Sequence, residues 1–134
     1  MFNLDDCMAF VTSQSAKIFS EALERRLSSY HITRSQWIAM YYIDTSDSIT
    51  QRELADKMSV REPTVVRLLQ KMGQEGLLAR ASSDEDKRVK QLLLTEKGSR
   101  LCGDLLPIAE KFKSDTIAGI SEEDLQTLKN VLDT

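Results

Sequence analysis

Side chains suited to hydrogen bonding with nucleic acid gather on one face of a short segment that begins near Pro63. Thr64 and Arg67 are three residues apart, so they project from the same side of a helix. Arginine can form two hydrogen bonds to guanine in the major groove, and threonine can touch a thymine methyl group or a phosphate. The remaining polar residues expected on this face are Arg61, Gln70 and Lys71. Of these, the two basic residues are better placed for phosphates.

Two short helices are needed to hold this face in position. Thr50 and Glu53 have the spacing of a capping box, which predicts the start of the first helix. Pro63 suits the start of the second helix and Gly76 suits its end. We expect the second helix to bury one stripe, formed by Val65, Leu68, Leu69 and Met72. This pattern predicts a helix-turn-helix whose second helix fits a major groove.

A β-hairpin is expected directly after the second helix. Segments 77–80 and 89–94 have the character of strands on either side of a polar loop, and Ile49 is expected to pair beside them. A hairpin in this place forms a wing, whose tip can reach phosphates or an adjacent minor groove. The basic residues near the tip are Lys87, Arg88 and Lys90.

Taken together, these motifs resemble those of MarR-type winged helix-turn-helix transcription regulators. The resemblance extends from about Cys7 to Leu132, with six segments in the family's order and spacing. The matching segments are 33–37, 51–55, 63–69, 76–80, 86–88 and 94–98. The resemblance implies an obligate homodimer that binds pseudo-palindromic operators in double-stranded DNA and usually represses. In many members a small phenolic or lipophilic ligand, or oxidation of a cysteine, releases the DNA.

The resemblance also assigns roles to individual residues. It supports Pro63, Thr64 and Arg67 as groove-facing residues. In the wing, it implies that Asp86 holds the loop while the basic residues Lys87 and Arg88 meet DNA. Many relatives have arginine where this chain has Lys87, and lysine acts as a point charge without a planar fork.

The predicted fold is mainly α-helical with a small β-wing, in a single domain over residues 1–134. A winged helix-turn-helix lobe over 33–96 lies between dimerisation helices at 1–30 and 98–134. The first long helix carries two apolar stripes, which indicates contacts with both its own lobe and a partner subunit. Pro107 is expected to kink or split the helix that follows the wing.

The final helix, which begins near Ser121, has an apolar stripe that no later segment can cover. That stripe consists of Leu125, Leu128, Val131 and Leu132. We therefore expect it to pack against the first helix of a partner subunit.

Two further positions are candidates for sensing a signal. Trp37 and Tyr41 lie at i and i+4 on one helical face, and in similar family members these positions border a ligand cleft. Cys7 lies at the start of the first helix, close to where oxidation-sensing relatives carry a thiol, although their cysteine aligns with Met8. Helix N-termini favour thiolates, whereas the neighbouring acids oppose them. Cys102 lies in an apolar helix and is expected to be buried.

Charge and composition restrict the remaining choices. The net charge is −3, but residues 50–100 hold 11 basic and 8 acidic residues, a local surplus of three positive charges. No Gly-rich phosphate loop or metal-ligand cluster occurs, so we expect neither an enzyme nor a cofactor. The acidic start lacks the features of a signal peptide and no segment is apolar enough to span a membrane, which predicts a cytoplasmic protein. Two alternatives stay open: an oxidation sensor acting through Cys7, and a winged-helix protein-interaction module that binds no DNA.

Overall fold

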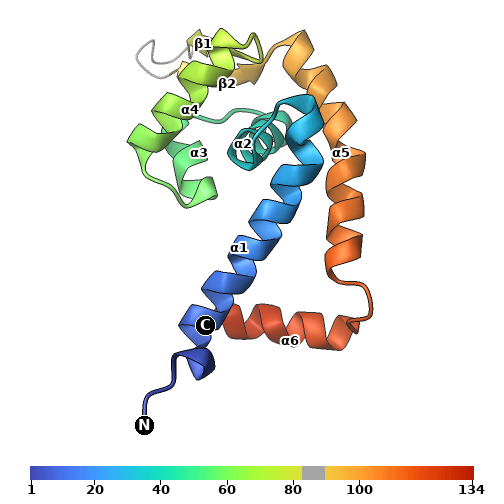
Figure 1. Ribbon diagram of the computed structural model, residues 1–134. Coiled ribbons are helices and arrows are strands. Elements are labelled where there is room, and N and C mark those ends of the chain that lie inside the picture. The colour runs from blue at the N-terminus through green and yellow to red at the C-terminus, as the bar shows by residue number, and fades with distance from the viewer. Residues whose placement is uncertain (83–89) are drawn as a thin grey trace.

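The computed structural model describes residues 1–82 and 90–134 (Figure 1). In chain order the elements are η1 (Leu4–Asp6), α1 (Met8–Leu27), η2 (Ser28–Tyr30), α2 (Arg34–Thr45), α3 (Gln51–Met58), α4 (Glu62–Gln74), β1 (Leu78–Ser82), β2 (Lys90–Leu94), α5 (Glu96–Thr116) and α6 (Glu122–Leu132), where η marks a 3-10 helix. The predicted fold class, mainly helical with a small β-wing, is confirmed.

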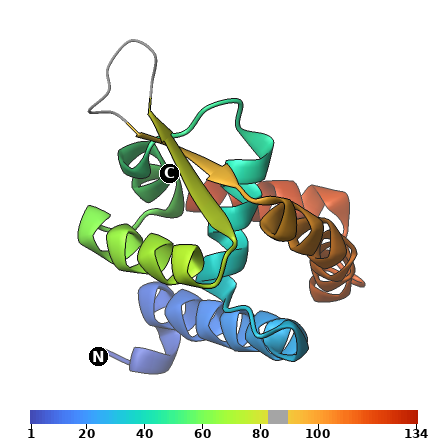
Figure 2. The same ribbon diagram turned by 90° about the horizontal axis from the view of Figure 1, so that it is seen from above.

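Helix α2 lies at the centre of the lobe, as both views show (Figures 1 and 2). Helices α3 and α4 lie on one side of α2 and the upper ends of α1 and α5 lie on the other, while the hairpin lies above α2 (Figures 1 and 2). Below this level α1 and α5 diverge, and α6 turns back across the base (Figure 1). The lobe is therefore densely packed, whereas the lower halves of the long helices extend away from it.

Side-chain caps explain where most helices begin. At α2 the full capping box forms, because the Thr33 hydroxyl accepts from the Gln36 N–H and the Gln36 side chain accepts from the Thr33 N–H. The box predicted at Thr50 is only half formed. The Thr50 hydroxyl accepts a hydrogen bond from the Glu53 N–H at 3.2 Å, which is the first half of the box. The Glu53 carboxylate accepts from the same hydroxyl at 2.9 Å rather than from the Thr50 N–H, so the second half is not formed.

The hydrophobic core joins the three lobe helices to the ends of the long ones. Of the stripe predicted for α4, Val65, Leu69 and Met72 are fully buried and Leu68 is partly buried. The other large side chains that are fully buried in this core are Leu27, Met40, Ile49, Leu54, Leu77 and Leu105. Burial of about 25 cal/mol per Å² of apolar surface makes this cluster the main source of stability for the lobe.

The hairpin pairs β1 and β2 in antiparallel register, with Leu78 opposite Leu94 and Ala81 opposite Gln91. The predicted third strand is reduced to a single bridge between Thr50 and Gln91, supported by the Leu92 N–H donating to the Ile49 carbonyl at 3.0 Å. This bridge ties the wing to the segment that leads into α3.

Two expectations for the long helices need correction. The first dimerisation helix, expected within residues 1–30, is not one α-helix over that range: short 3-10 turns lie at both ends, and α1 covers Met8–Leu27. Nor does Pro107 split α5, which is helical through it. Proline removes the hydrogen bond to the carbonyl four residues back, here that of Gly103. Both residues are exposed, so water can satisfy that carbonyl. Among the described residues, no helix has the length and apolar character needed to cross a bilayer.

The start of α5 approaches the hairpin very closely. A Cβ atom built on Gly98 would lie 2.2 Å from the backbone oxygen of Leu77, which is far too close. The same backbone oxygen accepts a hydrogen bond from the Thr95 N–H at 3.0 Å, so it cannot move away without loss. Glycine at position 98 is therefore required for α5 to contact the start of β1.

We expect Gly98→Ala to destabilise the fold by about 1–3 kcal/mol, the range for overpacking a well-packed site. Gly103→Ala is the matched control, since nothing lies within 4 Å of a Cβ atom there. It should stabilise the chain by up to about 1 kcal/mol through helix propensity. Urea unfolding followed by circular dichroism measures both. Equal effects of the two substitutions would contradict the close approach.

Candidate nucleic-acid interface

Helix α4 presents its polar face to solvent, as predicted. The Arg61, Pro63, Thr64, Arg67, Gln70 and Lys71 residues are all exposed. Arg61 is the N-cap rather than a helical residue, and Pro63 is the second residue of the helix rather than the first. This face therefore offers hydroxyl, amide, guanidinium and ammonium donors along one side of α4.

Both ends of α4 are fixed by contacts with neighbouring elements. At the start, Ser59 adopts a left-handed conformation (φ 57°) that ends α3 and redirects the chain into α4. At the end, the side chain of buried Gln36 lies 3.4 and 3.5 Å from the two carboxylate oxygens of Glu75. The Lys97 ammonium group donates to the Glu75 carbonyl oxygen at 2.9 Å. The helix is thus tied to α2 and to α5 where it meets the hairpin.

A small cleft of about 460 Å³ lies on the N-terminal half of α4. It is lined by Glu62, Pro63, Val66 and Arg67. The Glu62 carboxylate lies 3.4 Å from the Gln51 side-chain amide, which draws it towards α3. Arg67 thus lines this cleft together with Pro63 and Val66 and is itself exposed to solvent.

The wing is described only in part. Arg80 is exposed on β1 and lies opposite Leu92 in the register. Asp86, Lys87 and Arg88, which the sequence predicts at the wing tip, lie outside the described residues. Their proposed contacts with DNA stay predictions.

The two aromatic residues predicted to border a ligand cleft do lie together. The ring centroids of Trp37 and Tyr41 are 6.0 Å apart at an interplanar angle of 51°, and Tyr42 meets Tyr41 edge-on at 5.7 Å. Trp37 is 7% exposed whereas Tyr41 is 42% exposed. Tyr41 thus offers the accessible ring of the pair.

The two cysteines have different environments. Cys7 is half-buried at the N-cap of α1, where its side chain makes no capping hydrogen bond. Cys102 is fully buried, and burial, with a smaller contribution from the negative charge of Asp44, raises its pKa to about 11. The expectation of a buried Cys102 is confirmed.

At pH 8 we expect a thiol reagent such as DTNB to leave Cys102 unmodified in the folded chain. With a pKa of about 11, its thiolate fraction is on the order of one in a thousand, and the thiolate is the reactive form. Each modified thiol releases one coloured product of the reagent, and the absorbance of that product gives the number of modified thiols before and after urea is added. A Cys7→Ser chain should show no fast reaction; a fast thiol in that variant would contradict the assignment.

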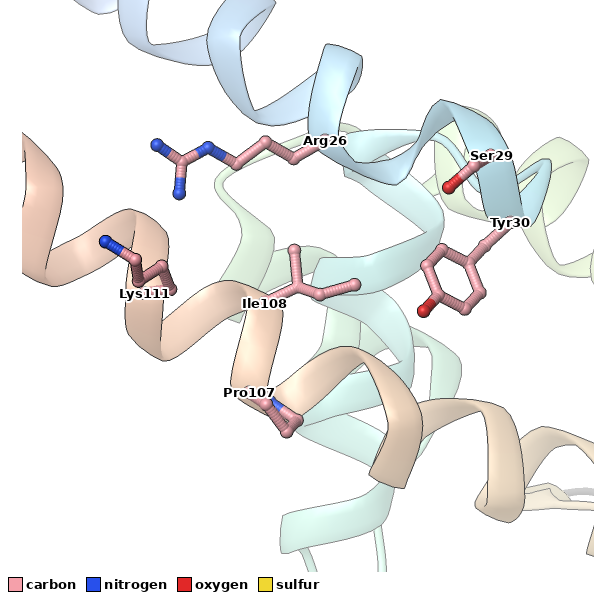
Figure 3. A pocket seen from close by; sticks show the side chains of 6 residues that line it. All are labelled: Arg26, Ser29, Tyr30, Pro107, Ile108 and Lys111. Carbon is pink, nitrogen blue, oxygen red and sulfur yellow. The ribbon is translucent and has the colours of Figure 1, made fainter.

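A second pocket, shallow and open to solvent, lies where the end of α1 passes α5, and the sequence did not indicate it. It is lined by Arg26, Ser29, Tyr30, Pro107, Ile108 and Lys111 (Figure 3). These residues come from segments almost eighty residues apart, and no local motif relates them. Only the exposed pair Lys111 and Asp115, at i and i+4, is visible as a local pattern.

Comparisons with known proteins agree with this geometry. The profile of the MarR family matches residues 32–90, the segment from the start of α2 to the wing. The crystal structure of the transcriptional regulator PA3341 is 32% identical, with a TM-score of 0.84 over 94% of this chain and 93% of that chain. This chain belongs to the MarR family. It is therefore a transcriptional regulator.

Other solved structures share the fold at lower identity. CouR from Rhodococcus jostii RHA1, bound to p-coumaroyl-CoA, is 20% identical, with a TM-score of 0.87 over 98% of this chain and 93% of CouR. The S. aureus MepR–DNA complex is 22% identical, with a TM-score of 0.87 over 95% of this chain and 94% of MepR. The long helices of the MarR regulator described here are thus part of the shared architecture.

Proposed function

We propose that this MarR-family regulator binds double-stranded DNA in a sequence-specific manner, as a homodimer on a pseudo-palindromic operator. One observation carries the proposal: α4 buries its apolar stripe and leaves Thr64, Arg67 and Lys71 exposed on the opposite face. A helix presented in this way beside a hairpin has the shape and donors for a major groove. MepR, which shares the fold, has been solved as a complex with DNA, and this supports DNA as the partner of this chain.

Local charge favours this contact despite the acidic total. The surplus of positive charge lies in residues 50–100, and screening confines electrostatic effects to about 8–10 Å at ordinary salt. Phosphates near α4 therefore meet mainly the basic side chains of this lobe. Few phosphates are neutralised, so non-specific binding should be modest and the operator preference should depend on base contacts.

The apolar surface of the long helices supports the homodimer. Helix α6 has no buried residue, and Val131 and Leu132 are 65% and 62% exposed. In Figure 1 its C-terminal end crosses the lower part of α1, but Figure 2 shows the two helices well separated in depth. Large apolar side chains are also exposed on the N-terminal two-thirds of α1, at Met8, Ile18 and Phe19.

Exposed apolar faces of this extent are typical of subunit contacts. A two-fold arrangement would let α6 of each subunit cover α1 of the other. It would also set two α4 helices about one DNA turn apart, roughly 34 Å, as a palindromic operator requires.

We expect Leu128→Glu to separate the subunits, because it places a charge in a face that should become buried. The dissociation constant of the dimer should rise roughly tenfold or more. Size-exclusion chromatography with light scattering measures the mass. Leu93→Glu, at an exposed leucine of the wing, is the control and should stay dimeric. A dimeric Leu128→Glu chain, or a monomeric parent, would contradict the interface.

Arg67→Ala should remove operator preference while leaving the dimer intact. Loss of a bidentate hydrogen bond from arginine to guanine lowers the free-energy difference between the correct and a wrong base by about 1–3 kcal/mol. Lys71→Ala should instead weaken binding to all sequences and lower the salt slope by about one. Lys113→Ala removes an exposed cation near the end of α5 and serves as the control.

Fluorescence anisotropy with an operator selected from a random DNA pool, and with a scrambled duplex, measures both effects across a range of salt concentrations. Unchanged sequence preference in Arg67→Ala would remove Arg67 from base reading.

The regulatory output is proposed to be repression that a small ligand relieves. The CouR structure holds p-coumaroyl-CoA, which supports a ligand-responsive mechanism in this fold. The Trp37–Tyr41 pair is the candidate site for that ligand, since the Tyr41 ring is accessible to solvent and lies against Trp37. The alternative signal is oxidation of Cys7, and release of DNA by peroxide that survives Cys7→Ser would rule it out.

The rival function is a winged helix that binds an acidic protein rather than DNA. Binding to random duplex DNA separates the two readings, because a DNA reader shows weak affinity that falls steeply with salt. Absence of any such affinity, with an intact dimer, would favour the protein-interaction module.

A further inference from the structure

The outward face of α4 contains an apolar cleft among its polar side chains. The cleft of about 460 Å³ is lined by Glu62, Pro63, Val66 and Arg67. Pro63 is exposed and Val66 is partly buried. Pro63, Val66 and Arg67 stand at i, i+3 and i+4, so their side chains share one side of the helix. Val66 therefore places an apolar side chain beside the arginine that we propose to bind guanine.

Arg67 separates the two halves of this face. Thr64 and Lys71 are exposed but do not line the cleft. With 3.6 residues per turn, they lie on the other side of Arg67 from Val66. One half of the face therefore offers a hydroxyl and an ammonium group, and the other half offers an apolar surface.

The cleft suits a base better than a phosphate. The Glu62 carboxylate lies at its rim, 3.4 Å from the side-chain amide of Gln51 in α3. A phosphate placed in the cleft would meet this carboxylate as a like charge, which is unfavourable. The apolar group that unmodified DNA displays in its major groove is the C5 methyl group of thymine. Burial of that methyl group against Pro63 and Val66 removes apolar surface from water on both sides of the contact.

We propose that Pro63 and Val66 bind the C5 methyl group of the pyrimidine next to the guanine bound by Arg67. The proposal rests on the proposed DNA binding and names a base step within it: a 5-methylpyrimidine beside a guanine in each half-site. Neighbouring bases on one strand are about 3.4 Å apart along the DNA axis, so a side chain next to Arg67 can reach the adjoining base. The pyrimidine is thymine in unmodified DNA, and 5-methylcytosine carries its methyl group at the same position.

The test begins with an operator selected from a random DNA pool, in which each half-site should contain a thymine directly beside a guanine. The guanine that Arg67 binds is located first. Its replacement by 7-deazaguanine removes the N7 acceptor, which should weaken binding by the parent protein but not by Arg67→Ala. Fluorescence anisotropy measures the dissociation constant of each duplex.

Replacement of the neighbouring thymine by deoxyuridine then removes only the methyl group. We expect the dissociation constant to rise roughly three- to fivefold, the effect of exposing one methyl-sized group. Deoxyuridine in the DNA that flanks the operator is the control and should change nothing. If cytosine replaces the same thymine, with guanine opposite, 5-methylcytosine should bind roughly three- to fivefold more tightly than cytosine. These substitutions leave the protein unaltered.

Two variants assign the methyl contact to the cleft. Val66→Ala should bind the thymine operator roughly three- to fivefold more weakly and should no longer distinguish thymine from deoxyuridine. Lys71→Ala is the matched control, because it changes the same helix face outside the cleft. It should weaken binding to every duplex and keep the full difference between thymine and deoxyuridine. Thermal unfolding followed by circular dichroism confirms that both variants are folded.

The proposal is overturned if the parent protein binds the thymine and deoxyuridine operators equally. It is also overturned if Val66→Ala keeps the full methyl effect, or if Thr64→Ala removes that effect in its place. Sequence-specific binding without a methyl effect contradicts this inference alone. Absence of operator binding by the parent contradicts the proposed DNA-binding function, and this inference with it.

Discussion

Burial of the apolar stripe of α4 sets the orientation of everything that faces outward from it. Val65, Leu69 and Met72 are fixed in the core, so the helix cannot rotate about its axis without exposing them. The opposite face, with Thr64 and Arg67, is thereby presented in one orientation. Packing inside the lobe and recognition outside it are two results of the same amphipathic pattern.

The contacts at the end of α4 extend this constraint to the rest of the chain. Gln36, the one polar side chain found buried among the described residues, lies against Glu75, and Lys97 binds the carbonyl of the same residue. Gly98 lets α5 reach the backbone of Leu77. These contacts connect α5 with the start of the hairpin and the end of α4, so a shift of α5 would disturb both.

Local sequence patterns were enough to predict the lobe. Amphipathic spacing, caps and the polar loop identify α2, α3, α4 and the hairpin, and the MarR-type motifs in register identify the family. Of the kink or split expected at Pro107, the split does not occur, because the unpaired carbonyl belongs to Gly103, which is exposed and needs no protein partner. The low helix propensity of proline does not show whether the carbonyl that it leaves unpaired is exposed to water.

Contacts between distant segments could not be predicted in the same way. Arg26 and Asp115 are 89 residues apart, and only the crossing of α1 and α5 brings them together. Similarly, the paired environment of Trp37 and Tyr41 was visible from spacing, but the burial of one ring and the exposure of the other depend on the surrounding helices. Spacing reports which residues share a face, whereas tertiary packing decides what that face meets.

The uncovered apolar face of α6 has a genetic consequence for cells that carry both an altered and an intact copy of the gene. If α6 and α1 join two copies of the chain, then the surfaces for pairing and for recognition lie on different helices and can be damaged separately. A subunit altered only on α4 would still pair with an intact one, and the mixed pair would hold a single half-site. In a cell that carries both alleles, such an altered copy is expected to act as a dominant negative.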